Sequence, residues 1–102
     1  DTELLRAKGL MGRTRLGDGG GMFFMFENLG AYCFWMKGMK IPIDIVWIQG
    51  DHVVGVAENI LPDKNFLPKL YYPPEPVDFV LEIKAGSVAR YNIKTGDQII
   101  IH

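Results

Sequence analysis

A single cysteine, Cys33, occurs among the 102 residues, so neither an internal disulfide nor a cysteine-rich zinc site can form. No apolar run approaches the ~18 residues that span a bilayer, so we predict no transmembrane segment. The formal net charge is -1, without the basic excess typical of nucleic-acid-binding domains, so we predict no nucleic-acid partner. The only serine, Ser87, stands outside any Gly-x-Ser-x-Gly segment, which argues against a serine nucleophile.

Hydrophobic residues are abundant instead and make up 48% of the sequence. This composition and the chain length predict one globular domain over residues 1–102 with a single core. Leu4, Ala7 and Met11 fall on one face of a helical pattern, so a helix is predicted over residues 2–11. The glycines that follow Asp18 end this pattern and predict a flexible connection.

Short runs rich in β-branched and aromatic residues, or alternating between apolar and polar residues, predict strands. Gly50 and Asp51 fit a tight turn, which predicts an antiparallel hairpin, and Ser87 can start a short helix. We therefore predict a mostly β domain, an antiparallel barrel or sandwich with an N-terminal helix and a short helix near the C-terminus. The predicted strands are 22–26, 32–36, 43–49, 52–60, 77–83 and 98–101.

Residues 61–76 hold five of the six prolines, interleaved with leucines, tyrosines and a phenylalanine. Proline cannot donate a hydrogen bond to a neighbouring strand, so this segment is predicted to be a long loop. Because the loop carries many apolar side chains, we expect it to fold over another part of the domain.

Several segments match a known family in order and spacing. These segments are Gly9-Leu10-Met11-x-Arg13, the glycine-rich turn into Met22-Phe23-Phe24-Met25-Phe26, Phe34-Trp35-Met36-Lys37 and Ile41-Pro42-Ile43-Asp44-Ile45. The chain resembles the DUF192 family, also called UPF0127. The resemblance implies a small β-barrel-like domain of unassigned biochemical role, found in bacteria and archaea and often exported or membrane-tethered in bacteria.

The chain departs from this family pattern at two places. Family members usually have a strand before the first helix, whereas this sequence begins at the helix. Gly38-Met39 stands where the family commonly has Asn-Thr or a similar pair. The compartment stays open: cytoplasmic, or exported or membrane-tethered if an N-terminal segment has been trimmed.

Lys37, Asp44 and Glu58 are the charged residues closest to predicted apolar strands, and with Arg13, which follows the predicted helix, they form a candidate site. A carboxylate beside a desolvated cation can perform acid–base chemistry or hold a charged ligand. The alternative is structural, because Asp44 faces opposite to its apolar neighbours in the strand and can decorate the outer face or cap a turn.

Aromatic residues offer a second candidate site, in which Trp35, with Tyr71, Tyr72 and Phe66 from the long loop, forms a platform for a sugar ring or a peptide. Trp47 is assigned to the core. A metal site is not predicted, since Cys33 and the nearby methionines match the pattern of ordinary core residues, and no cofactor is predicted.

These observations leave the biochemical function unknown, with three hypotheses. The first is a non-catalytic module that binds a small polar ligand or a protein partner. The second is a small hydrolase or acid–base enzyme that uses Asp44 and Glu58 with Lys37 or Arg13. The third is a homodimer that forms by strand exchange at an exposed sheet edge.

Overall fold

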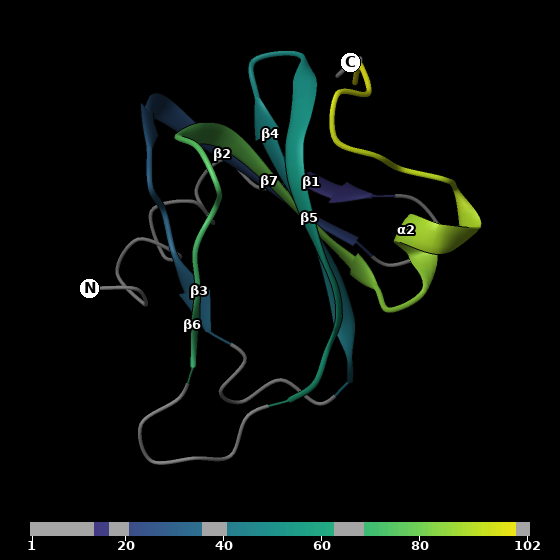
Figure 1. The fold of residues 1–102 in the computed structure, drawn as a ribbon. Helices are drawn as coiled ribbons and strands as arrows, with labels where there is room; N and C mark the ends of the chain where they lie inside the picture. The colour runs from purple at the N-terminus through teal and green to yellow at the C-terminus, as the bar shows by residue number, and fades with distance from the viewer. Residues whose placement is uncertain (1–13, 17–20, 36–40, 63–68, 100–102) are drawn as a thin grey trace.

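The chain folds around a five-stranded sheet in which every pair of neighbouring strands is antiparallel (Figure 1). The computed structural model describes residues 14–16, 21–35, 41–62 and 69–99. The strands, in sheet order, are β1 (Thr14–Leu16), β2 (Gly21–Gly30), β7 (Val77–Lys84), β4 (Ile43–Gln49) and β5 (His52–Ile60).

Two smaller units lie on opposite sides of this sheet (Figure 1). A two-stranded antiparallel ribbon, β3 (Phe34–Trp35) with β6 (Leu70–Tyr71), packs on the side we call the inner face. Helix α2 (Ser87–Arg90) lies on the other side, the outer face, where its Val88 is buried. Both faces of the sheet are therefore covered, although only one is expected from a simple alternating pattern.

The alternation of side chains along the strands divides the core into two clusters. On the inner face, Phe34 of the ribbon packs with Phe24, Trp47 and other buried residues of the sheet. On the outer face, Val46 and other residues of the central strands pack against α2 and the segment after it. The sequence-based assignment of Trp47 to the core is confirmed, since only 2% of its surface is exposed.

The predicted hairpin is confirmed, with β4 and β5 joined at Gly50, whose φ of 63° suits glycine. Helix α2 also begins at Ser87 as predicted. Within the described residues the fold is mostly antiparallel β with very little helix, which confirms the prediction of a mostly β domain. The described strands do not close into a barrel, because β1 and β5 lie at opposite edges of the sheet.

Other details differ from the prediction. β2 runs on to Gly30. Of the strand expected over residues 32–36, Phe34–Trp35 forms a strand, residues 32 and 33 do not, and residue 36 lies outside the described part. The expected long loop contains β6, and Thr14–Leu16 forms a strand that the sequence did not predict. At the predicted last strand the structure describes an isolated bridge between His52 and Gln98, and residues 100–101 lie outside the described part. The helix predicted over residues 2–11 also lies outside it.

The loop prediction holds in one respect, because residues after β6 fold back over the sheet. A Cβ atom added to Gly55 would lie 2.7 Å from Cγ of Pro74. Glycine is therefore required at this position of β5 for the proline ring to pack so closely. Within the described residues, no helix has the length and hydrophobicity needed to cross a membrane.

Candidate functional site

Asp44 is the charged residue at the centre of the predicted site, and it is completely buried. Its neighbours Ile43 and Ile45 face the inner side of the sheet, so its carboxylate faces the outer side, toward α2. Three backbone amides donate hydrogen bonds to this carboxylate: Asn59 to Oδ1 at 2.8 Å, Gly86 to Oδ2 at 3.0 Å and Val88 to Oδ2 at 2.9 Å. Asp44 therefore joins three segments that are distant in the sequence.

The first of these segments is a β-bulge at the end of β5. Ile43 pairs with Ile60 and Ile45 pairs with Ala57, so Asp44 alone faces the two residues between them, Glu58 and Asn59. Asn59 has a φ of 53°, a conformation that asparagine tolerates better than most residues. The bond from its N–H to Asp44 satisfies a donor that the bulge removes from regular strand pairing.

The other two segments meet at the start of α2. The residue at the N-terminal cap is Gly86, which has no side chain to accept a hydrogen bond from the first turn. Asp44 performs this role from β4 by accepting the N–H groups of Gly86 and Val88. The sequence suggested either a role in catalysis or ligand binding for Asp44, or a structural role such as capping a turn. The hydrogen bonds to Gly86 and Val88 match the capping role.

Of the other members of the charged cluster, the structure describes only Glu58. Glu58 is exposed. Arg13 and Lys37 lie outside the described residues, so their place in a site stays a prediction. No group of three or more His, Cys, Asp or Glu residues within the described ranges is arranged to hold a metal ion.

A second buried carboxylate, Glu82 on β7, was not among the sequence candidates, and 4% of its surface is exposed. Its register with Met22 and Ile45 places it on the inner face, opposite to Asp44. The alternating pattern of β7 indicated a solvent-facing position, and nothing in the sequence signals that the inner face is covered there as well.

The aromatic candidates lie on the ribbon. Phe34 and Tyr71 face each other across it and pack toward the sheet. Because side chains alternate along a strand, Trp35 and Leu70 point to the opposite side, and Tyr72 continues on that side just beyond β6. Trp35 and Leu70 are half-buried and Tyr72 is 59% exposed. We call these three residues the ribbon surface.

A cation lies against Tyr71, on the side of the ribbon opposite to the ribbon surface. Nζ of Lys69 is 5.1 Å from the centroid of the Tyr71 ring, within the range of a cation–π contact. Trp35 faces Leu70 directly, so Tyr72 is its diagonal neighbour, and such neighbours lie about 7–8 Å apart, within reach of large aromatic side chains. The ribbon thus carries Trp35 and Tyr72 on one side and Tyr71 on the other, so only Trp35 and Tyr72 share a surface, while Phe66 lies outside the described residues.

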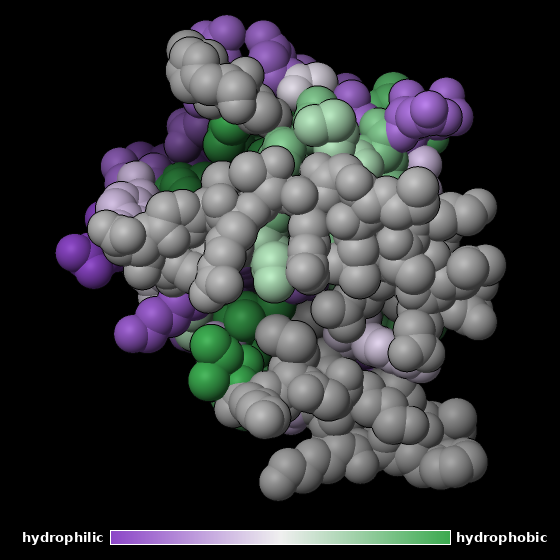
Figure 2. Space-filling view, turned by 180° about the vertical axis from the view of Figure 1, so that it is seen from behind, coloured by the Kyte–Doolittle hydropathy of each residue, from purple (hydrophilic) through white to green (hydrophobic). Residues whose placement is uncertain are grey.

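A separate apolar surface lies at one end of the sheet. Figure 2 shows hydrophobic atoms at its lower left, at the end where β4 begins and β5 ends. The exposed apolar residues next to these strand ends are Ile41, which is 55% exposed, and Leu61, which is 66% exposed. The sequence gives no sign of this surface, because the pattern around an isolated apolar residue beside a strand does not tell whether its side chain is covered in the fold.

The architecture defines a class of small domain: a five-stranded antiparallel sheet with a short ribbon on one face, one helical turn on the other, and a buried aspartate that joins the sheet to that turn. The family model for DUF192, described as "Uncharacterized ACR", matches residues 1–101, and the chain belongs to this family. It is a family of unknown function. No curated protein matches the chain.

Two solved structures are similar to it. One is a protein of unknown function from Novosphingobium aromaticivorans DSM 12444, with 39% sequence identity and a TM-score of 0.73 over 91% of this chain. The other, from Sinorhizobium meliloti 1021, is described as a candidate transcription regulator and has 32% identity and a TM-score of 0.73, also over 91% of this chain. The chain spans 65% of the first protein and 70% of the second.

Proposed function

We propose that this domain is a small binding module that holds a polar ligand or an extended partner segment against the ribbon surface. The observation that carries this proposal is the aromatic pair Trp35 and Tyr72 on the side of the ribbon that points away from the core. In this proposal ribbon and sheet form a sandwich-like unit, with the buried Phe34 fixing the ribbon and its other side left for a ligand.

The chemistry of the ribbon surface suits a ligand with both apolar and polar parts. Aromatic side chains supply a large apolar contact area at a small cost in conformational entropy, and a tyrosine hydroxyl adds a hydrogen-bonding group. Sugars, nucleotides and short peptides all combine such apolar and polar parts.

The enzyme alternative has less support. A general base must come within hydrogen-bonding distance of the proton that it removes. Asp44 is fully buried and both of its oxygens already accept backbone N–H groups, while Glu58 is exposed. These contacts favour a structural role for Asp44. The homodimer through a sheet edge stays a prediction.

The binding proposal is tested with a panel of oligosaccharides, nucleotides and peptides, using chemical-shift changes in NMR spectra and shifts in melting temperature. We expect at least one class to bind, with the largest chemical-shift changes at Trp35 and Tyr72. The substitution Tyr72→Ala should abolish these changes, because it removes the most exposed ring of the ribbon surface.

Tyr91 provides a matched control for Tyr72. It is 65% exposed, close to the 59% of Tyr72, and it follows α2 on the other side of the sheet. Cζ of Arg90 lies 5.5 Å from the centroid of the Tyr91 ring, so this tyrosine also stands next to a cation, as Tyr71 does beside Lys69. Tyr91→Ala should leave binding unchanged. The proposal fails if no class of compound binds, or if the two substitutions weaken binding equally.

A further inference from the structure

Residues 93–99, which we call the C-terminal strap, cover part of the outer face. The strap follows α2, and its Ile93 and Ile99 pack against the buried cluster that includes Val46, Ile48 and Val53. In Figure 1 it runs from α2 back toward the turn of the β4–β5 hairpin. The strap therefore covers the outer-face cluster with two apolar side chains, those of Ile93 and Ile99.

Backbone hydrogen bonds fasten the strap to the beginning of β5. The N–H of Val53 donates to the carbonyl of Asp97 at 2.8 Å, and the N–H of Gly96 donates to the carbonyl of Val53 at 2.8 Å. The N–H of Ile99 donates to the carbonyl of Asp51. These contacts cover the edge of β5 only at its start.

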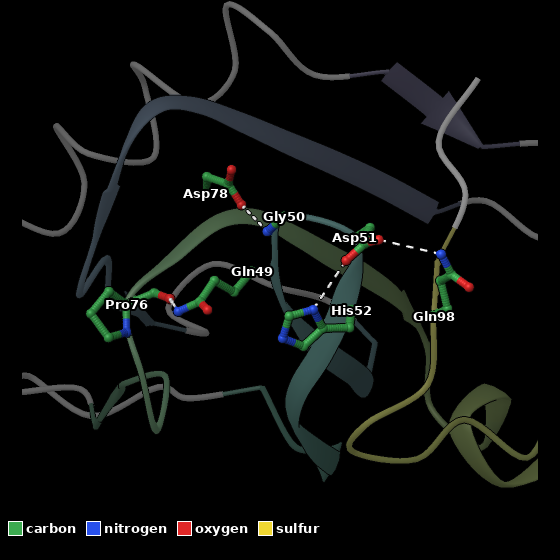
Figure 3. Close-up of polar contacts among 7 residues, drawn as sticks. All are labelled: Gln49, Gly50, Asp51, His52, Pro76, Asp78 and Gln98. Atoms are coloured by element: carbon green, nitrogen blue, oxygen red, sulfur yellow. Dashed lines mark hydrogen bonds and ion pairs between the residues drawn. The ribbon is translucent and has the colours of Figure 1, made fainter.

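Side chains at the hairpin turn complete the attachment (Figure 3). Oδ2 of Asp51 accepts a hydrogen bond from Nε2 of Gln98 in the strap at 3.3 Å, and Oδ1 lies 3.1 Å from Nδ1 of His52. The hydrogen bonds from His52 and then from Gln98 lower the pKa of the Asp51 carboxyl from its ordinary value of 3.8. The carboxylate is thus the ionisable part of the attachment.

We propose that the C-terminal strap is an acid-labile clasp, which detaches from β5 more readily when Asp51 is protonated while the sheet stays folded. Exposed hydrogen bonds and ion pairs are individually weak, and a segment held by few of them opens more readily than the sheet. Detachment would uncover the backbone edge at Val53 and the apolar cluster beneath the strap.

The direction of the pH dependence follows from the lowered pKa. The hydrogen bond from His52, the larger cause, acts within the hairpin, whereas Gln98 donates to Asp51 only while the strap is docked. The contribution of the Gln98 hydrogen bond is therefore complete above about pH 3.8 and is lost as the pH falls through the lower pKa of the docked state.

Two other carboxylates face this region. Asp78 accepts the N–H of Gly50 at the hairpin turn, and Asp97 accepts the N–H of Lys94 within the strap, both at 2.8 Å. Both hydrogen bonds hold the turns at either side of the clasp.

Amide hydrogen exchange, followed by NMR, tests the clasp. In the unmodified protein, we expect the protection factors of the Val53, Gly96 and Ile99 amides to fall as the pH is lowered below about 3.8, while the Val46 and Val80 amides in the central strands stay protected. Loss of protection at all five amides together, or none at the strap, would overturn the proposal.

The substitution Asp51→Asn gives a second measurement at neutral pH. It should lower the protection of the Gly96 and Ile99 amides by about two- to fivefold, the range expected for an exposed pair of this strength. Glu75→Gln is the matched control, because Glu75 is an exposed carboxylate for which the described structure gives no hydrogen bond. Equal effects of the two substitutions, or none from Asp51→Asn, would contradict the role of Asp51.

Discussion

The substitution Asp44→Asn tests whether one buried carboxylate holds β4, the β5 bulge and α2 together. Asparagine has the same shape, but one carboxylate oxygen becomes an NH₂ group. Two amide N–H groups point at Oδ2 and a third, from Asn59, points at Oδ1. Whichever way the new amide is oriented, its NH₂ group faces at least one backbone N–H, and a donor facing a donor makes no hydrogen bond.

The expected loss of stability can be estimated from these contacts. The less damaging orientation keeps the carbonyl oxygen toward Gly86 and Val88 and leaves the N–H of Asn59 without an acceptor. Hydrogen bonds to a charged group contribute about 1.5–3 kcal/mol, and a buried donor left unpaired costs about 1–3 kcal/mol. We therefore expect Asp44→Asn to lower the free energy of unfolding by about 2–4 kcal/mol, a large part of the roughly 5–15 kcal/mol of a typical domain.

Urea denaturation followed by tryptophan fluorescence measures this change, since Trp47 is buried in the core and reports on unfolding. The melting temperature should fall by about 10–20 °C. Asp78→Asn is the control: Asp78 accepts one N–H at an exposed turn, so its substitution should cost less than about 1 kcal/mol. A loss below about 0.5 kcal/mol for Asp44→Asn would refute the reasoning, because surface substitutions have effects of that size.

Two further substitutions test the packing on the inner face, both by urea denaturation. Gly55→Ala places a Cβ atom 2.7 Å from Cγ of Pro74. We expect the free energy of unfolding to fall by about 1–3 kcal/mol, because the proline ring cannot rotate away. Unchanged stability would mean that the segment around Pro74 moves freely. Phe34→Ala removes a fully buried ring that lies 5.8 Å from Trp47, at an expected cost of about 3–5 kcal/mol. Leu29→Ala, at a residue 55% exposed, should cost less than about 0.5 kcal/mol, and equal losses for Phe34 and Leu29 would mean that the ribbon adds little to the core.

The features that the sequence predicted well depend on neighbouring residues. The β4–β5 hairpin follows from a Gly-Asp pair between two strand-like runs, and the start of α2 follows from Gly86-Ser87. The alternating run over residues 77–83 predicted β7 for the same reason. Each of these signals lies within a few residues of the structure that it determines.

The features that the sequence did not reveal depend on residues far apart. The three amides that bind Asp44 follow it by 15, 42 and 44 positions, so no local pattern distinguishes a capping carboxylate from a catalytic one. Strand β6 lies in a proline-rich segment, and only its pairing with β3 makes it a strand. Glu82 alternates like a solvent-facing residue because coverage of the inner face is a tertiary property.

If Asp44 is purely structural, its substitution should change the stability of the domain but not its ligand binding. If the carboxylate serves only the three backbone amides, Asp44→Asn should bind ligand as well as the unmodified protein at any temperature at which the variant is fully folded. Tyr72→Ala should behave in the opposite way, because an exposed tyrosine contributes little to stability but forms part of the ribbon surface. Melting temperatures and ligand titrations on both variants give the comparison. A folded Asp44→Asn protein that fails to bind would show that this carboxylate acts on the ligand, and the distinction between a structural aspartate and an aromatic binding surface would then be wrong.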